Sequence, residues 1–198
     1  VLTKLELPLR EPDLSLWKQN LSHFQRGGQR VRVALVGKYV ELPDAYKSIH
    51  EALLHGAMAN RCTVDIVPIS SESITADQAA SLLSGFDGIL VAPGFGKRGV
   101  AGKLEAVRYA REHGVPFLGI CLGMQCAVVE FARDVLGYSG ATSREWEPVK
   151  GEPVIDLLEA QKGIANLGGT MRLGAYDCDL VEGSRAAEAY GSLHIRER

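Results

Sequence analysis

The chain has 198 residues, 46% of them hydrophobic and 23% charged, a composition that fits one globular domain with a sizeable core. Its 22 basic and 24 acidic residues give a net charge of −2, and without a basic block or an aromatic-basic stripe no nucleic-acid partner is expected. No apolar segment approaches the length of a membrane span, so no membrane partner is expected either.

The ends and the cysteines of the sequence indicate its context. The chain starts without an initiator methionine or a signal-peptide pattern, which predicts an excerpt of a longer protein. Four cysteines show no C-x-x-C or His-rich spacing: Cys62, Cys121, Cys126 and Cys178. This usage indicates reduced thiols in a cytoplasmic protein, with no metal site.

The predicted elements begin with a lead-in over residues 1–30. It contains a short amphipathic helix, which Asp13 is predicted to cap, with apolar residues at helical spacing: Leu14, Trp17, Leu21 and Phe24. A strand over 31–36 follows and ends at Gly37. Asp44 is then predicted to cap a second helix, whose inward face holds Tyr46, Ile49, Leu53, Leu54 and Ala57.

Strands and helices continue to alternate through the middle of the chain. The pattern predicts strands at 63–67, 86–91 and 115–118 and helices at 77–84 and 102–113. The alternation predicts an α/β fold with a parallel sheet covered on both faces, and sites beyond the C-terminal strand ends. Later in the chain, 142–146 is predicted as loop, 154–158 as a strand, and 167–174 as a tight turn entering a strand.

The segment 115–131, V-P-F-L-G-I-C-L-G-M-Q-C-A-V-V-E-F, joins the fourth strand to a helix through G-I-C-L-G. This is the G-x-nucleophile-x-G pattern, with Cys121 as the nucleophile. Glycines on both flanks fit a sharp, strained turn, and the following helix N-terminus favours a thiolate. The N–H of Leu122 is then placed to bind an oxyanion. The alternative is a buried cysteine in an ordinary strand-to-helix turn.

The loop P-G-F-G at 93–96 is predicted to supply the second half of an oxyanion hole, through the N–H of Gly94. Gln125 lies one helical turn after Cys121 and is in reach of a substrate above the sulfur. A base is harder to find. His50, His55 and His113 fall on predicted helices and His23 in the lead-in, which leaves His194. If the segment 193–196 is a strand, His194 simply alternates outward.

Several segments resemble a known family. The stretch 119–125, G-I-C-L-G-M-Q, resembles the nucleophile segment of class I (triad type) glutamine amidotransferases. The stretches 37–49, 93–99 and 167–174 are similar to the glutaminase domains of the CTP synthase family, and the similarity covers essentially the whole chain. The resemblance implies a three-layer, flavodoxin-like sandwich of the amidotransferase type. It implies a linker from an upstream synthetase domain at 1–30 and the amidotransferase domain at 31–198, with the C-terminal part missing.

The resemblance also implies an activity. Cys121 attacks the side-chain amide of L-glutamine and forms a thioester, and the released ammonia passes to the synthetase domain. That domain aminates UTP to CTP with ATP and Mg²⁺, GTP activates the glutaminase, and the enzyme is a homotetramer; no cofactor is implied within this domain. Gly94, Gln125 and Glu145 are implied glutamine contacts, and Phe95 borders the pocket.

Three further residues are implied in the GTP-responsive region: Lys38, Tyr46 and Arg98. Alternatively, Tyr46 belongs to a core helix face, and Lys38 and Arg98 are solvated loop charges. The sequence departs from the family where Ala92-Pro93 replaces the usual Pro-Gly. The family's basic R-H-R-H-R-Y-E segment and its catalytic H-P-E are expected beyond Arg198, so this excerpt is expected to lack the base and to hydrolyse glutamine hardly at all. Two other assignments stay open, a DJ-1/PfpI-like cysteine enzyme and a non-catalytic regulatory or oligomerisation module.

Overall fold

The computed structural model describes residues 2–8, 11–26, 28–42, 44–146, 151–157 and 175–197. The chain divides into two compact units, Val1–Asp156 and Leu157–Arg198. Within the described residues, no helix combines the length and the apolar character that crossing a membrane requires. All four cysteines are free thiols.

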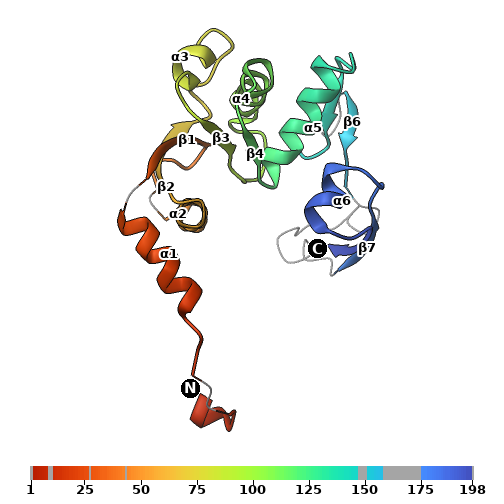
Figure 1. Cartoon of the computed structure of the whole chain (residues 1–198). Coiled ribbons are helices and arrows are strands. Elements are labelled where there is room, and N and C mark those ends of the chain that lie inside the picture. Colours follow the sequence, from red (N-terminus) through yellow and green to blue (C-terminus); the bar gives the residue numbers. More distant parts are fainter. Residues whose placement is uncertain are drawn as a thin grey trace. The chain divides into compact units, whose positions relative to one another are not determined.

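A four-stranded parallel sheet forms the centre of the first unit (Figure 1). Its strands are β1 (Gln29–Gly37), β2 (Cys62–Ser70), β3 (Gly88–Val91) and β4 (Phe117–Gly119), in the order β2-β1-β3-β4. Val36 pairs with Val91, and Val91 pairs with Gly119. Because the strands are parallel, the segments that follow β1, β3 and β4 all leave the sheet at the same edge.

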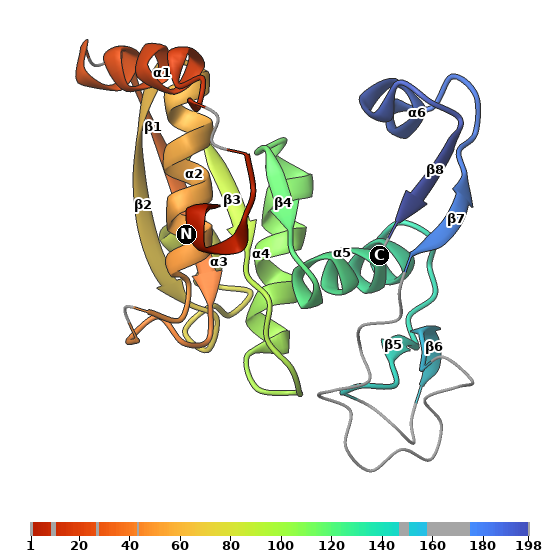
Figure 2. The same ribbon diagram turned by 90° about the horizontal axis from the view of Figure 1, so that it is seen from below.

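The two faces of the sheet bury alternate residues of the same strands. On one face Ala34, Val36, Ile89 and Val91 pack with α3 (Ala79–Leu83), α4 (Val100–His113) and α5 (Leu122–Asp134). On the other face Leu35 and Leu90 pack with residues of α2 (Lys47–Ala59). Figures 1 and 2 show α2 on one side of the sheet and α4 on the other, so the predicted three-layer α/β sandwich is confirmed.

The prediction that Asp44 caps the second helix is wrong. Tyr46 is the N-cap residue of α2, and the backbone before it forms turns in which Lys47 N–H donates to the Asp44 carbonyl. The Tyr46 ring is buried, and its hydroxyl oxygen accepts hydrogen bonds from the N–H groups of Lys38 and Tyr39. The helix therefore starts where the buried tyrosine anchors the chain, not at the first residue able to cap it.

Other boundaries shift by a few residues. The structure has β4 two residues later than predicted, because Pro116 has no N–H and uses its carbonyl to accept from Ile89 instead. The prediction of loop at 142–146 is partly wrong, since β5 (Ala141–Ser143) pairs in parallel with β6 (Glu152–Ile155). The predicted strand at 154–158 overlaps β6 only at 154–155, while residue 158 and the predicted turn at 167–174 lie outside the described residues.

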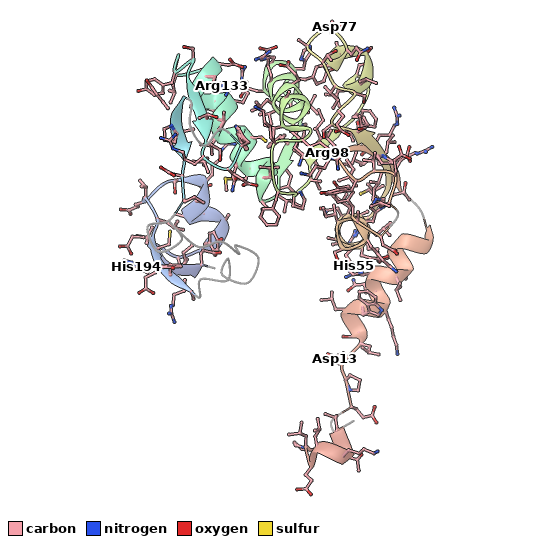
Figure 3. All side chains as sticks on the ribbon, turned by 180° about the vertical axis from the view of Figure 1, so that it is seen from behind. Asp13, His55, Asp77, Arg98, Arg133 and His194 are labelled. Carbon is pink, nitrogen blue, oxygen red and sulfur yellow. The ribbon has the colours of Figure 1, made fainter. Side chains whose placement is uncertain are left out.

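The lead-in holds a short 3-10 helix, η1 (Leu2–Leu5), and α1 (Ser15–Arg26). The predicted capping role of Asp13 is confirmed, because its carboxylate accepts a hydrogen bond of 2.9 Å from the Ser15 N–H. Hydrogen bonding to the Ser15 side chain, and then to the Ser15 N–H, lowers the pKa of Asp13. The Trp17 ring meets the His55 ring of α2 edge-on at 5.4 Å (His55 is labelled in Figure 3), so the helix contacts the domain through its apolar stripe.

In the part of the second unit that the structure describes, two antiparallel strands form a small sheet accompanied by one helix. β7 (Tyr176–Asp179) pairs with β8 (His194–Glu197), and α6 (Arg185–Tyr190) lies between them in sequence. The Ser184 hydroxyl caps α6 by accepting from the Ala187 N–H at 3.2 Å. The segment around His194 is therefore a strand, the case considered from the sequence in which His194 alternates outward.

Candidate active site

Cys121 occupies a strained turn between β4 and α5. Its φ is 54° and its ψ is −109°, a backbone conformation that residues other than glycine rarely adopt. It is the N-cap residue of α5, and its side chain is exposed. Cys126, one turn later, is fully buried, and burial raises the pKa of its thiol to about 12. The structure therefore exposes the cysteine that the sequence selects as nucleophile and keeps its neighbour protonated.

The glycines that flank Cys121 are required by close backbone packing. A Cβ on Gly123 would lie 2.1 Å from the Val91 carbonyl oxygen of β3. A Cβ on Gly119 would lie 2.5 Å from the Gly123 carbonyl carbon. Both distances are far below van der Waals contact, so the turn holds its shape only with glycine at these two positions, as the G-x-Cys-x-G pattern predicts.

The first N–H of α5 is available to a ligand. Ile120 N–H donates to the Val91 carbonyl and Gly123 N–H to the Ile120 carbonyl. Between them, the Leu122 N–H has no acceptor among the described residues. Such groups at a helix N-terminus carry partial positive charge and attract anions. This geometry fits the predicted role of Leu122 as an oxyanion donor, which stays a prediction.

The loop after β3 is the second predicted donor. Gly94 has a φ of 137°, which only glycine adopts readily, and its N–H has no acceptor in the part of the chain that the structure describes. Since Val91 pairs with Gly119, this loop and the Cys121 turn leave neighbouring strands at the same edge. Phe95, predicted to border the pocket, is 61% exposed and has room to do so.

Two buried lysines support this loop from within the protein. Lys103 of α4 is completely buried, and its Nζ donates to the carbonyl oxygens of Ala92 at 2.6 Å and Pro93 at 3.4 Å. Desolvation lowers the pKa of Lys103 to about 8. Lys38, which follows β1 and is 6% exposed, donates through Nζ to the Phe95 carbonyl. Lys38 is thus not the solvated loop charge considered as an alternative from the sequence.

Glu145, which follows β5, contacts the same loop. Its Oε1 accepts a hydrogen bond of 2.8 Å from the Gly96 N–H, and its own N–H donates to the Ser143 hydroxyl. Ser143 ends β5 and is fully buried. The neighbouring Trp146 is buried and donates from Nε1 to the Thr142 hydroxyl at 3.1 Å. Short strand pairing and a buried tryptophan therefore bring Glu145, distant in sequence, to the loop beside Cys121.

Gln125 carries an unsatisfied acceptor. Its Oε1 is buried and has no hydrogen-bond partner among the described residues, while its backbone N–H donates to the Cys121 carbonyl. Buried polar atoms in native proteins nearly always have a partner, so an orphaned amide oxygen one turn from the nucleophile is suited to a ligand that brings a donor. This observation supports the predicted role of Gln125 in binding substrate.

The three residues predicted for the GTP-responsive region do not share one environment. Lys38 and Tyr46 are buried under the loop and joined by the hydrogen bond described above. Arg98, labelled in Figure 3, is about half exposed; its guanidinium pairs with Glu72 at 2.9 Å and lies over the Tyr39 ring at 5.1 Å. Arg98 is the residue of the three that faces solvent.

The histidines that the structure describes are engaged elsewhere. His50 and His55 lie on α2, and His55 contacts Trp17. His113 stacks on Tyr109, with Nδ1 at 3.0 Å from the Tyr109 carbonyl. In the second unit the exposed His194 lies 2.6 Å from an oxygen of Asp179. Across the described ranges, no group of three or more His, Cys, Asp or Glu residues is arranged to hold a metal ion.

Lys103 is not among the residues predicted from the sequence, although its position carries a signal. Lys103 has the helical spacing of the buried residues Val100, Ala106, Val107 and Ala110 of α4. A lysine within an apolar helical stripe is rarely buried without a specific partner. That placement in the sequence is enough to indicate a lysine with a structural or functional task.

A cysteine on a strained strand-to-helix turn, at one edge of a parallel sheet, is typical of cysteine-elbow enzymes. Comparison with known proteins identifies the family within this class. Residues 41–196 match the family Glutamine amidotransferase class-I, and the chain belongs to this family. The relatives most similar in sequence include CTP synthases. The CTP synthase of Cytophaga hutchinsonii is 54% identical over 199 residues, covering 100% of this chain and 37% of the relative. That of Geobacillus kaustophilus is 54% identical over 194 residues, 98% of this chain and 36% of the relative.

A solved structure shows the same likeness. The Trypanosoma brucei CTPS glutaminase domain with bound acivicin matches with a TM-score of 0.72 and 35% identity, covering 85% of this chain and 65% of that one. The prediction of a class I glutamine amidotransferase of the CTP synthase kind is confirmed as a family assignment. The chain spans about a third of the length of the curated relatives, 37% in the first case.

Proposed function

We propose that the chain is the glutaminase part of an enzyme that makes CTP. The observation that carries the proposal is the exposed Cys121, held at positive φ at the start of α5 beside the Gly94 loop. In this proposal Cys121 Sγ attacks the side-chain amide carbon of L-glutamine. The thiol proton passes through a base to the leaving nitrogen, and ammonia departs from a glutamyl thioester. Water then cleaves the thioester to give glutamate and regenerate the thiol.

The oxyanion of each tetrahedral intermediate is proposed to lie between the N–H groups of Gly94 and Leu122. Both are free of acceptors among the described residues, which supports this role. One donor of this kind is typically worth about 3 kcal/mol of barrier. A dry, fixed pair of donors stabilises charge that develops only in the transition state and costs no reorganisation.

Substrate recognition is assigned to Gln125, Glu145 and Phe95. The orphaned Oε1 of Gln125 accepts from a donor of the bound amino acid. Glu145 uses one carboxylate oxygen on the Gly96 N–H and retains lone pairs for the α-ammonium group of glutamine. Phe95, largely exposed at the tip of the loop, forms one wall.

The activity of the whole protein is proposed from the relatives, which are CTP synthases. Ammonia would pass to an upstream synthetase domain that uses ATP and Mg²⁺ to aminate UTP, in a cytoplasmic homotetramer. Residues 1–30 form the linker to that domain, and 31–198 belong to the amidotransferase domain. GTP acts on the region of Arg98, with Lys38 and Tyr46 beneath it; the exposed Arg98 guanidinium over the Tyr39 ring supports this assignment.

The 198-residue chain by itself is proposed to turn glutamine over very slowly. The support is the position of the described histidines of the first unit, which contact Trp17 or Tyr109 or lie on α2. If His194 were the base, His194→Ala would abolish the glutaminase activity of the full-length protein. We expect His194→Ala to retain glutaminase activity. The wild-type imidazole pairs with Asp179, and both side chains are exposed on the β7–β8 strand pair.

Covalent labelling tests the proposal directly. Acivicin, an electrophilic glutamine analogue, is expected to add one label to the full-length protein by intact-mass measurement, and Cys121→Ala is expected to lose it completely. Cys126→Ala is the matched control, because its thiol is buried and its loss should leave labelling unchanged. Undiminished labelling of Cys121→Ala would reject the assignment. A wild type with neither labelling nor glutaminase activity would favour the non-catalytic module.

A further inference from the structure

The loop from Ala92 to Gly96 is held by its carbonyl oxygens. Lys103 Nζ binds the Ala92 oxygen at 2.6 Å and the Pro93 oxygen at 3.4 Å. Lys38 Nζ binds the Phe95 oxygen. The Phe95–Gly96 peptide is fixed at its other end as well, because the Gly96 N–H donates to Glu145. The N–H of Gly94 is left without an acceptor among the described residues.

The planarity of the peptide bond links these contacts to the predicted donor. The Pro93 carbonyl and the Gly94 N–H belong to one peptide unit, and the described peptides are all trans. In a trans peptide the C=O and the N–H point in opposite directions. An ammonium on the Pro93 oxygen therefore turns the Gly94 N–H away from Lys103. It also polarises the amide, which makes the N–H a stronger donor.

Both lysines are buried beneath the loop surface. Lys103 is 0% exposed and Lys38 is 6% exposed. Burying an ammonium is costly, and desolvation lowers the pKa of Lys103 to about 8. Four titratable groups act on it, from three segments of the first unit: Cys126 and Cys121 at the start of α5, Lys38 after β1, and Glu145 after β5. A buried cation in this position acts on the reaction through the loop that it holds.

We propose that Lys103 and Lys38 are positioning residues for the oxyanion loop. Lys103 sets the Pro93–Gly94 peptide so that its N–H meets the carbonyl attacked by Cys121. Lys38 sets the Phe95–Gly96 peptide that Glu145 contacts. The inference rests on the proposed glutaminase function and adds two residues that act in it without touching glutamine.

Kinetics of Lys103→Met in the full-length protein test the inference. Methionine keeps the length of the side chain and removes the charge and the donors. We expect the kcat for glutamine hydrolysis to fall about tenfold, part of the effect of losing one oxyanion donor, with little change in KM. Alkylation of Cys121 by iodoacetamide should keep its rate, because displacement of iodide develops no oxyanion. Lys18→Met, at an exposed lysine of α1, is the matched control.

The dependence of kcat on pH distinguishes a positioning role of the Lys103 charge from a role in packing alone. In the wild type, kcat should fall as the pH rises through about 8, where Lys103 loses its charge, and Lys103→Met should lack this component. Lys38→Met provides an independent test at the other end of the loop, with a smaller loss of kcat in the same direction.

Three outcomes would overturn the inference. A folded Lys103→Met with wild-type kcat shows that the loop does not need the lysine. An equal fall in kcat and in iodoacetamide alkylation shows general damage to the site. A wild type without glutaminase activity removes the proposed function and this inference together, whereas an active wild type beside an unaffected Lys103→Met removes the inference alone.

Discussion

The Cys121 turn and the Gly94 loop lie at the same edge of one sheet, but they are held in place differently. The Cys121 turn depends on backbone packed against backbone, with Gly119 and Gly123 pressed onto each other and onto β3. The Gly94 loop depends on charged side chains from distant parts of the chain, Lys38, Lys103 and Glu145. The nucleophile is therefore fixed by local sterics, and the predicted oxyanion donor by remote charges.

This difference has consequences for how each half responds to change. A sterically packed turn is insensitive to pH and salt, but any added atom disrupts it. A loop held by buried ammonium groups tolerates small changes of volume, yet it depends on the protonation and hydrogen bonding of single residues. Three perturbations, taken from the largest expected effect to the smallest, test this contrast.

Gly123→Ala should disrupt the Cys121 turn, which is held by steric packing. The added Cβ would lie 2.1 Å from the Val91 carbonyl oxygen, so β3 and α5 must move apart. We expect a loss of about 3 kcal/mol or more in the free energy of unfolding, together with loss of acivicin labelling. Gly56→Ala, in α2 with no atom within 4 Å of the new Cβ, is the control and should stabilise by about 0.5–1 kcal/mol. Denaturant unfolding measures both, and an unaffected Gly123→Ala contradicts the packing argument.

Arg111→Met should loosen the link between α4, which carries Lys103, and α5, which follows Cys121. Arg111 donates through Nε at 2.8 Å and Nη2 at 2.7 Å to Glu130, whose carboxylate is 2% exposed. Removing the arginine leaves a buried, unpaired charge, which costs roughly 3 kcal/mol. Arg108→Met, which breaks partly exposed pairs on the same helix, should cost no more than about 1 kcal/mol. Equal losses in the two variants would contradict the role of burial.

The pH dependence of stability tests whether buried charge holds the Gly94 loop. Lys103 has its pKa lowered to about 8 in the folded protein, against about 10.4 for an unperturbed lysine. Between these values the unfolded state binds more protons, so the stability contributed by this group rises with pH. The difference in unfolding free energy between wild type and Lys103→Met should therefore grow in favour of the wild type from pH 7 to 9, by at most about 1.4 kcal/mol per pH unit. A flat difference contradicts a charged, buried Lys103.

The same contrast explains how much of the site could be predicted from sequence. The alternation of strands and helices and the G-x-Cys-x-G turn are local patterns, and both are confirmed. The contacts of Lys103 with Ala92 and Pro93, and of Glu145 with Gly96, join segments 10 to 49 residues apart. The periodicity of α4 indicates that Lys103 is buried. No local sequence pattern predicts which carbonyl oxygen a buried lysine will contact.

The errors at element boundaries also have physical causes. Asp44 has a side chain suited to capping, but the buried Tyr46 hydroxyl holds the backbone of Lys38 and Tyr39 and moves the start of α2. β5 is predicted as loop because a strand of three residues carries too little alternation to be recognised, so its pairing with β6 is not predicted from the sequence. In each case a contact distant in sequence overrides a local preference.

The backbone at Cys121 restricts which amino acids evolution or a protein engineer could place there. A φ of 54° is a genuine outlier for a side chain branched at Cβ. Threonine, valine and isoleucine are therefore disfavoured by conformation alone, before any question of reactivity. Serine has the same unbranched Cβ as cysteine and adds no such strain, so the turn accommodates a primary alcohol in place of the thiol more readily than a secondary one.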